Sequence, residues 1–263
     1  MYKLLLIDLD ETLLCKDGNT ICDENITAIK NAAAAGKYIS ICSGRSNMSI
    51  DKFNKKLGIS GFTIGYNGGI IYKDGEVLIC HYLEKQLVLD IIDFCRSNKV
   101  EVQLYQDEKF WIDKETFFTK QYCKRSMLSP EIVDDLKNHV GDRVNKLIIL
   151  ATHRKLKKLE KLMPDSIKEK CCTFFSHEYL YEFNPLNVTK GTAVKELANY
   201  LDIPIEQVIA IGDHENDIPM IKAAGLGVAV KNAIKPMLEC ADYITENDNN
   251  HGAVAEVINK FML

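Results

Sequence analysis

The sequence lacks a surplus of basic residues. Its 33 lysines and arginines are outnumbered by 37 aspartates and glutamates, which gives a formal net charge of -4. Nucleic-acid-binding proteins usually carry a basic face, so the composition predicts no nucleic-acid partner. An anionic ligand would have to be bound by local charges and a cation, because the field of the whole protein does not attract it.

The chain also lacks long apolar runs and clustered cysteines. No stretch approaches the roughly 20 apolar residues of a membrane span, and the aliphatic run after Met1 is too short for a signal peptide and soon reaches Asp8. The nine cysteines form no C-x-x-C pair and no Cys/His cluster with zinc spacing. These absences predict a cytoplasmic protein with reduced thiols and no membrane partner.

The chain does contain an alternation of short aliphatic runs and helical patterns. In its first part, the predicted strands are residues 4–7, 38–42, 62–65 and 69–72, and the predicted helices are residues 23–35 and 46–57. After residue 188 the same alternation returns, with strands at 207–211, 226–230 and 243–244 and helices at 191–201, 218–224 and 254–261. This order predicts an α/β protein whose Rossmann-like, mostly parallel sheet is split in sequence.

A different pattern separates the two halves. It begins with an amphipathic helix over 83–97 and continues with strands that alternate polar and apolar residues, at 100–104, 109–113, 145–150 and 173–183. The sequence therefore predicts a core of residues 1–82 and 188–263 and an inserted α+β domain of residues 83–187.

Two acids follow the first predicted strand, in the segment Asp8-Leu9-Asp10. Residues two apart in an extended chain point to the same side, so both carboxylates can converge at the carboxyl edge of the sheet, where open α/β sheets bind ligands. Two close acids repel each other, and a divalent cation such as Mg²⁺ relieves that repulsion. The same pair is also compatible with a solvated strand end or a helix cap.

Three other segments place polar groups at comparable positions. Ser43-Gly44 ends the second strand, where a hydroxyl and free backbone N–H groups make either an anion pocket or a plain helix N-cap. Asp213, Asn216 and Asp217 follow a later aliphatic strand and suit either a metal site or an acidic helix start. Lys190 precedes the returning helix, where its ammonium either reaches a phosphate oxygen or stays at the surface.

Together, these segments resemble the four motifs of the haloacid dehalogenase-like hydrolase superfamily. The match is close at residues 8–13 (DLDETL) and 212–220 (GDHENDIPM), and residues 224–233 (AGLGVAVKNA) are particularly similar to the Cof-type (subclass IIB) phosphatases. Those enzymes carry a large α/β cap at the place of the insert. The resemblance spans the whole chain and implies a Mg²⁺-dependent phosphatase that acts on a sugar phosphate or a phosphorylated cofactor.

The resemblance also implies a role for each matching residue. Asp8 would be the nucleophile that forms an aspartyl-phosphate, and Asp10 would protonate the leaving oxygen and then deprotonate the hydrolytic water. Asp217 would hold a metal-bound water or orient Lys190. The Mg²⁺ ligands would be the Asp8 carboxylate, the Asp10 carbonyl and Asp213. The phosphoryl oxygens would be bound by Ser43, Lys190, Asn216 and the backbone N–H groups of Leu9 and Gly44.

Some positions depart from the family pattern or have no implied role. Glu11 stands where glycine is commonest and is expected to alter the phosphate-binding turn or access beneath the cap, and Ser43 replaces a commoner threonine. Residues 67–69 (NGG) are predicted to form a tight turn, and His214 is expected to be local scaffolding. Arg45 receives no role.

Two other functions stay open at this point. A phosphomutase would use the same aspartyl-phosphate but return the phosphoryl group to a sugar. A non-catalytic, receiver-like signalling module would combine clustered acids, a hydroxyl and a lysine around Mg²⁺, although receivers are shorter and have no cap. The cap is expected to close over the site, exclude water and select the substrate. A monomer is the default expectation, with a homodimer as the alternative.

Overall fold

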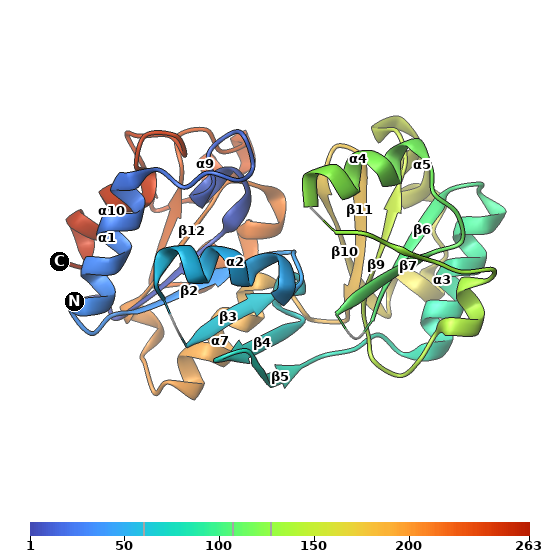
Figure 1. Ribbon diagram of the computed structural model, residues 1–263, viewed down its shortest axis with the longest axis horizontal. Helices are drawn as coiled ribbons and strands as arrows, with labels where there is room; N and C mark the ends of the chain where they lie inside the picture. The colour runs from blue at the N-terminus through green and yellow to red at the C-terminus, as the bar shows by residue number, and fades with distance from the viewer. Residues whose placement is uncertain (60, 107, 127) are drawn as a thin grey trace. The chain divides into compact units, whose positions relative to one another are not determined.

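A computed structural model describes residues 1–59, 61–106, 108–126 and 128–263 of the chain. The protein divides into two compact units (Figure 1). We call residues 1–79 and 189–263 the α/β unit and residues 80–188 the inserted unit. A mostly parallel sheet in the first and mixed α and β elements in the second confirm the predicted fold class. No helix within the described ranges is both long and apolar enough to cross a membrane.

The sheet of the α/β unit is built from short aliphatic runs. Its strands are β1 (Leu4–Ile7), β2 (Tyr38–Cys42), β3 (Phe62–Gly65), β4 (Ile70–Lys73), β5 (Glu76–Cys80), β12 (Val208–Gly212), β13 (Leu226–Ala229) and β14 (Tyr243–Ile244). Within the described residues their order is β14-β13-β12-β1-β2-β3-β4-β5. The pairs from β14 to β3 are parallel and β4 is antiparallel to β3. Parallel strands that are buried on both faces favour continuous apolar runs, as β1 and β12 show.

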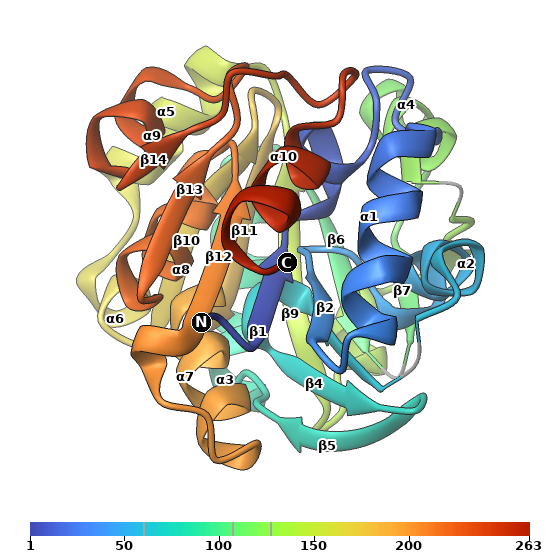
Figure 2. The same ribbon diagram turned by 90° about the vertical axis from the view of Figure 1, so that its left-hand side faces the viewer.

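Helices cover both faces of this sheet. One face carries α1 (Asp23–Ala34), α2 (Asn47–Leu57) and α10 (Ala253–Phe261), and the other carries α7 (Lys190–Tyr200), α8 (Ile218–Ala223) and α9 (Lys235–Cys240). Figure 2 shows α1 and α10 side by side over the strands. Because successive strand residues point to opposite faces, Leu5 and Ile7 of β1 pack in the first core and Leu4 and Leu6 in the second.

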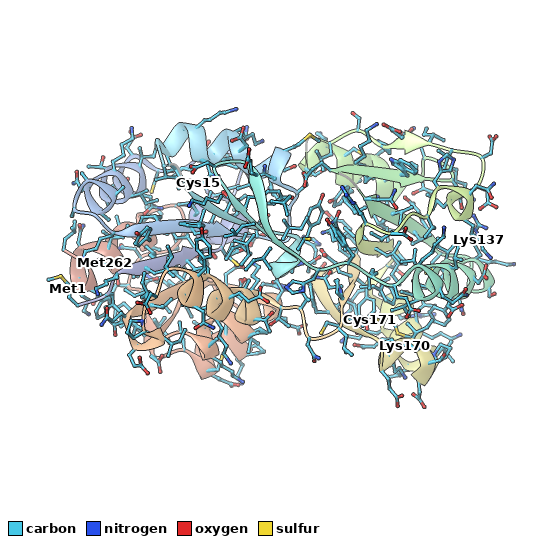
Figure 3. All side chains as sticks on the ribbon, turned by 90° about the horizontal axis from the view of Figure 1, so that it is seen from below. Met1, Cys15, Lys137, Lys170, Cys171 and Met262 are labelled. Carbon is cyan, nitrogen blue, oxygen red and sulfur yellow. The ribbon has the colours of Figure 1, made fainter. Side chains whose placement is uncertain are left out.

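The last helix of the chain is tied to the first strand. Met1 and Met262 lie close together in Figure 3. Tyr2 packs edge-on against Phe261, with ring centroids 6.4 Å apart. The segment after the insert therefore completes the same core that the first residues begin.

The inserted unit has its own sheet with two unlike faces. Its strands are β6 (Glu101–Gln106), β7 (Lys109–Ile112), β8 (Glu131–Ile132), β9 (Val144–Leu150), β10 (Cys171–His177) and β11 (Leu180–Pro185), in the order β10-β11-β9-β6-β7-β8 within the described residues. Its helices are α3 (Lys85–Ser97), α4 (Phe117–Ser126), α5 (His153–Leu162) and α6 (Asp165–Lys168). The apolar face packs against α3, α5 and α6. The opposite face carries buried polar side chains, among them Gln103, Lys146 and Glu182.

One predicted strand of the inserted unit is wrong in extent. The single strand predicted over 173–183 is an antiparallel hairpin of β10 and β11, which turns at Glu178 and Tyr179. Neither turn residue is a glycine or proline, which are the strongest markers of a turn. The sequence therefore gives no sign of the chain reversal.

The topology of the α/β unit places three strand ends at one edge. β1 lies between β2, which follows it through α1 on one face, and β12, which continues into α8 on the other face. The connections therefore leave the ends of β1 and β12 toward opposite faces. Open α/β sheets bind ligands in the crevice at such a switch point.

Candidate active site

The predicted site residues all belong to the α/β unit, and the structure brings four of them into one buried cluster. Asp8 follows β1, Asp213 and Asp217 follow β12, and Lys190 begins α7. One carboxylate oxygen from each of the three aspartates lies within 4.8 Å of the others. Asp8 and Asp213 are 5% exposed, and Asp217 and Lys190 are 0% exposed.

Lys190 is the positively charged member of this cluster. Its ammonium donates to Asp8 Oδ1 and to Asp217 Oδ1, both at 2.5 Å. Burial by itself lowers the pKa of Lys190, but the charges of Asp217 and Asp8 outweigh it and raise this pKa above the usual value for lysine. Lys190 therefore stays protonated at neutral pH and fixes the orientation of both carboxylates.

The three acids outnumber the lysine. Burial, together with repulsion from Asp217, raises the pKa of Asp8 to about 7, although Lys190 opposes this. Burial and the charges of Asp8 and Asp217 also raise the pKa of Asp213 well above its ordinary value. Three carboxylates against one ammonium leave a formal charge of -2 when all four groups are ionised. The cluster thus lacks two positive charges in a place where water cannot screen the repulsion.

Asp217 is the most tightly held of the acids. While Oδ1 accepts from Lys190, Oδ2 accepts from the backbone N–H groups of Asp213 at 3.0 Å and His214 at 3.1 Å. A Cβ at Gly212 would lie 2.5 Å from the Cβ of Asp217, so only glycine fits there. Asp217 thereby joins the end of β12 to Lys190, and His214 contributes its backbone N–H to this junction.

Asp10 lies apart from the acid cluster and pairs with Arg45. The guanidinium makes two bonds to its carboxylate, from Nη2 to Oδ1 at 2.6 Å and from Nε to Oδ2 at 2.9 Å. The Asp10 side chain is 31% exposed, whereas that of Asp8 is 7% exposed. A two-pronged guanidinium contact fixes the carboxylate and favours its ionised form. The strand-end pattern placed both acids at this edge, but it did not indicate Arg45 as the partner.

Two of the predicted phosphate-binding residues, Gly44 and Asn216, lie beside Asn67. Ser43 is buried and its Oγ accepts from the backbone N–H of Arg45 at 3.2 Å. The Asn216 amide donates to Asn67 Oδ1 at 3.0 Å, and a Cβ at Gly44 would lie 3.0 Å from the same Asn67 side chain. Asn67 has the left-handed φ of 56° expected of a tight turn. It also brings an amide to this edge, which the sequence interpretation did not anticipate.

Hydrogen bonds to residues outside the turn hold the conformation of residues 9–13. The Leu9 side chain is buried in the core, so only its backbone is available to a ligand. Glu11 has a φ of 60°, and its carbonyl accepts from the Asn232 amide at 2.8 Å. The Thr12 hydroxyl donates to Asp213 Oδ1 at 2.9 Å. Glycine is favoured at a left-handed position, which explains why glutamate is unusual here. Thr12 and Asn232 both lie in motif segments, although neither was predicted to contact the site.

Known proteins match the chain over nearly its whole length. The family model of the haloacid dehalogenase-like hydrolases matches residues 5–258. A 5-amino-6-(5-phospho-D-ribitylamino)uracil phosphatase of Bacillus subtilis is 32% identical over 271 residues, which cover 99% of this chain and 96% of the relative. A second Bacillus subtilis phosphatase of that name is 28% identical, with 95% of each chain covered. A haloacid dehalogenase-like hydrolase from Bacteroides thetaiotaomicron has a TM-score of 0.89 at 28% identity and covers 98% of this chain and 99% of its own.

Proposed function

Because the chain belongs to the haloacid dehalogenase-like hydrolases, we propose that it is a Mg²⁺-dependent phosphomonoesterase that forms an aspartyl-phosphate on Asp8. The observation that carries this proposal is the buried cluster in which Lys190 binds Asp8 and Asp217 at 2.5 Å and Asp213 lies beside them. A carboxylate is a competent nucleophile at phosphorus. Here it is oriented by a lysine that also attracts a phosphate.

The acid cluster fits Mg²⁺. It offers carboxylate oxygens within 4.8 Å of one another and a formal charge of -2, and Mg²⁺ prefers a few such oxygens together with water. Asp8 and Asp213 would bind the ion through their carboxylates and Asp10 through its carbonyl, while Asp217 would bind a metal-held water or orient Lys190. When bound, Mg²⁺ would neutralise charge on the phosphoryl oxygens.

In the proposed first step, the Asp8 oxygen that does not accept from Lys190 bonds to phosphorus as the bond to the leaving oxygen breaks. Asp10 gives the leaving oxygen a proton. Because the Arg45 contact favours the ionised Asp10, we infer that this ion pair opens and Asp10 gains its proton when substrate binds. Ser43, Lys190, Asn216 and the backbone N–H groups of Leu9 and Gly44 would bind the phosphoryl oxygens.

The second step restores the enzyme. A water attacks phosphorus and gives its proton to Asp10, while the bond between phosphorus and the Asp8 oxygen breaks. Inorganic phosphate leaves and Asp8 returns to a carboxylate. One residue can serve first as acid and then as base because the two steps reverse the direction of proton transfer.

For the substrate, we infer a sugar phosphate or a phosphorylated cofactor. Two relatives in Bacillus subtilis are named for 5-amino-6-(5-phospho-D-ribitylamino)uracil, which carries its phosphate on a polyol chain. We also propose that the inserted unit selects among such substrates. A cytoplasmic location and a monomeric state stay predictions.

The test is phosphate release from a panel of phosphorylated metabolites that includes this compound, with Mg²⁺ and with EDTA. Asp8→Asn should lower kcat by about 10⁴-fold or more, as losses of a nucleophile do in other covalent mechanisms, while the exposed control Asp202→Asn should keep wild-type kcat. No turnover on the panel or on p-nitrophenyl phosphate would favour the receiver-like function. An isomerised sugar phosphate without free phosphate would identify a phosphomutase.

A further inference from the structure

A cavity of about 650 Å³ lies within the inserted unit. Small-molecule sites usually measure about 300–1,000 Å³, so this space is large enough for a metabolite. Its walls come from the end of α3, the start of β6, the segment between β7 and α4, and the junction of β9 with α5, elements that are labelled in Figure 1. None of the residues assigned to the phosphatase reaction lines it.

The lining is basic although the chain is acidic. Its charged side chains are Arg96, Lys99, Lys114, Lys155, Glu101 and Asp113. Four cations and two acids give a formal charge of +2, in a chain whose net charge is -4. The lining of the cavity is therefore positively charged, whereas the protein as a whole is negatively charged.

Both acids of the lining already have partners. Asp113 accepts from Arg96 at 2.9 Å, and Arg96 also binds Asp135 outside the cavity at 2.6 Å. Glu101 accepts from the hydroxyls of Thr116 and Thr119. Arg96 is thus outnumbered by its two carboxylates, and the attraction for an anion must come from the lysines.

The lysines have no acidic partner. The ammonium groups of Lys99 and Lys114 make no hydrogen bond or ion pair to any residue that the structure describes, and that of Lys155 donates to the Lys99 carbonyl at 2.7 Å. Like charges around one cavity repel, and an anion between them would relieve that repulsion. A phosphate dianion would balance the formal charge of +2, and lysine ammonium groups bind phosphate as point charges.

The remaining walls are mostly apolar. Val102 and Leu150 are buried at the base, and Val100 and Phe118 are partly exposed. Thr152 lies at the start of α5, and its side chain accepts no capping hydrogen bond from the helix. The positive end of that helix favours the anionic part of a ligand on this side. The apolar walls suit an aromatic ring.

We propose that this cavity is a binding site for a mononucleotide-sized metabolite, with an aromatic ring against Val100 and Phe118 and a phosphate among Lys99, Lys114 and Lys155. The site is separate from the proposed catalytic residues. It therefore goes beyond the phosphatase function and does not depend on it.

The test is calorimetric titration of the full chain with adenosine 5′-monophosphate in EDTA, in the Asp8→Asn background to prevent turnover. Lys155→Glu reverses one charge of the cavity, and Val100→Trp fills its apolar side. Lys158→Glu is the matched control, because Lys158 is an exposed lysine of the same helix that does not line the cavity. Circular dichroism and thermal unfolding would verify that each variant is folded.

We expect Lys155→Glu to weaken binding about tenfold or more, which corresponds to about 1.4 kcal/mol. Val100→Trp should abolish binding, and Lys158→Glu should stay within about twofold of its parent. Adenosine without the phosphate should bind at least about tenfold more weakly than the nucleotide. The proposal is overturned if the nucleotide does not bind, if adenosine binds equally well, or if Lys155→Glu and Lys158→Glu have the same affinity. None of these results depends on whether Asp8 is a nucleophile.

Discussion

Each unit of the protein buries a lysine among acids, and the two surroundings differ in charge balance. In the inserted unit, Lys146 pairs with Glu182 at 2.9 Å, and its ammonium lies 5.0 Å from the centre of the Tyr105 ring. In the α/β unit, Lys190 contacts two aspartates, and Asp213 adds a third carboxylate to the cluster. Among the groups named here, the first arrangement sets one cation against one anion, and the second sets one cation against three.

The difference distinguishes the Lys146 ion pair from the cluster of the proposed active site. A balanced, hydrogen-bonded pair satisfies itself, although its desolvation makes it a weak source of stability. An unbalanced cluster costs stability until a further cation binds, and such costs concentrate at functional sites. Burial alone therefore does not mark the site of chemistry, since both lysines are buried. The excess of acids around Lys190 does.

The largest expected effects on the free energy of unfolding come from replacing Lys146 or Lys190. Lys146→Met removes the ammonium that the buried Glu182 carboxylate accepts from and should lower the free energy of unfolding by about 3–5 kcal/mol, with EDTA or with Mg²⁺. Lys190→Met should cost a similar amount in EDTA, but Mg²⁺ should restore part of it because the ion replaces the missing charge. Urea unfolding of both variants in both buffers measures this. If Mg²⁺ stabilised Lys146→Met and Lys190→Met equally, the proposed difference between the surroundings of the two lysines would be wrong.

The acid excess should also set the pH dependence of the metal-free protein. The folded pKa of Asp8, about 7, lies above the ordinary value of 3.8, so the folded state binds this proton more tightly than the unfolded state does. Stability should therefore fall as pH rises from about 4 to about 7, by on the order of 4 kcal/mol. Denaturant unfolding in EDTA at a series of pH values measures the slope.

Mg²⁺ and Asp8→Asn provide the controls for that slope. Saturating Mg²⁺ should reverse it, because metal binding requires ionised carboxylates and is weakened by protons. Asp8→Asn should remove the part of the slope that Asp8 contributes in EDTA, while Asp213, whose pKa is also raised by burial, should keep the rest. A metal-free protein whose stability rises over the same pH range would show that the acid excess is not costly.

Neutralising one acid in each unit should change the stability of the metal-free protein in opposite directions. Asp213→Asn reduces the excess and should stabilise the protein in EDTA, while Glu182→Gln breaks the balanced pair and should destabilise it. Wild type should gain about 2.7 kcal/mol at a Mg²⁺ concentration 100 times the Kd, and Asp213→Asn should lose most of that gain. Thermal unfolding with increasing Mg²⁺ tests both statements. A wild-type response to Mg²⁺ in Asp213→Asn would exclude Asp213 as a ligand.

The sequence was informative about the α/β unit because its signals are local. Strands β1 and β12 are continuous aliphatic runs, and Asp8 and Asp213 follow them directly. Placing the ends of parallel strands at one edge is then enough to bring the Asp8 segment near Asp213. The hairpin of β10 and β11 was missed because no glycine or proline marks its turn.

The contacts that orient the site could not be predicted in the same way. Asp10 and Arg45 are 35 positions apart, and Asn67 and Asn216 are 149 apart. Whether such side chains meet depends on rotamers and on loop conformations that no local pattern specifies. Even the two acids of the first motif separate, because Asp10 turns to Arg45 while Asp8 turns to Lys190.

The ion pair of Asp10 and Arg45 tests whether a pair of one cation and one anion always has a purely structural role. The Asp10 side chain is 31% exposed but that of Arg45 only 10%, so Arg45→Met should lower the free energy of unfolding by about 1–3 kcal/mol, less than the loss of a fully buried partner. Because Asp10 must leave Arg45 before it protonates the leaving oxygen, Arg45→Met should lower kcat only about tenfold, less than the about 10²- to 10⁴-fold that a general acid or base itself contributes, with little change in KM. Arg96→Met is the matched control in the inserted unit. A rise in kcat would instead mean that Arg45 holds Asp10 away from the substrate.

The smallest effect should come from two glutamates with the same backbone strain, one in each unit. Glu11 and Glu108 both have a φ of 60°, and glycine at either position should raise the free energy of unfolding by about 1 kcal/mol or less. Glu11→Gly should keep kcat within about twofold, because Asn232 bonds the backbone carbonyl, which glycine retains. Urea unfolding and phosphate release on both variants measure this. If Glu11→Gly lowers kcat while Glu108→Gly does not, then the Glu11 carboxylate itself contributes to the reaction, and the glutamate is more than a tolerated departure from glycine.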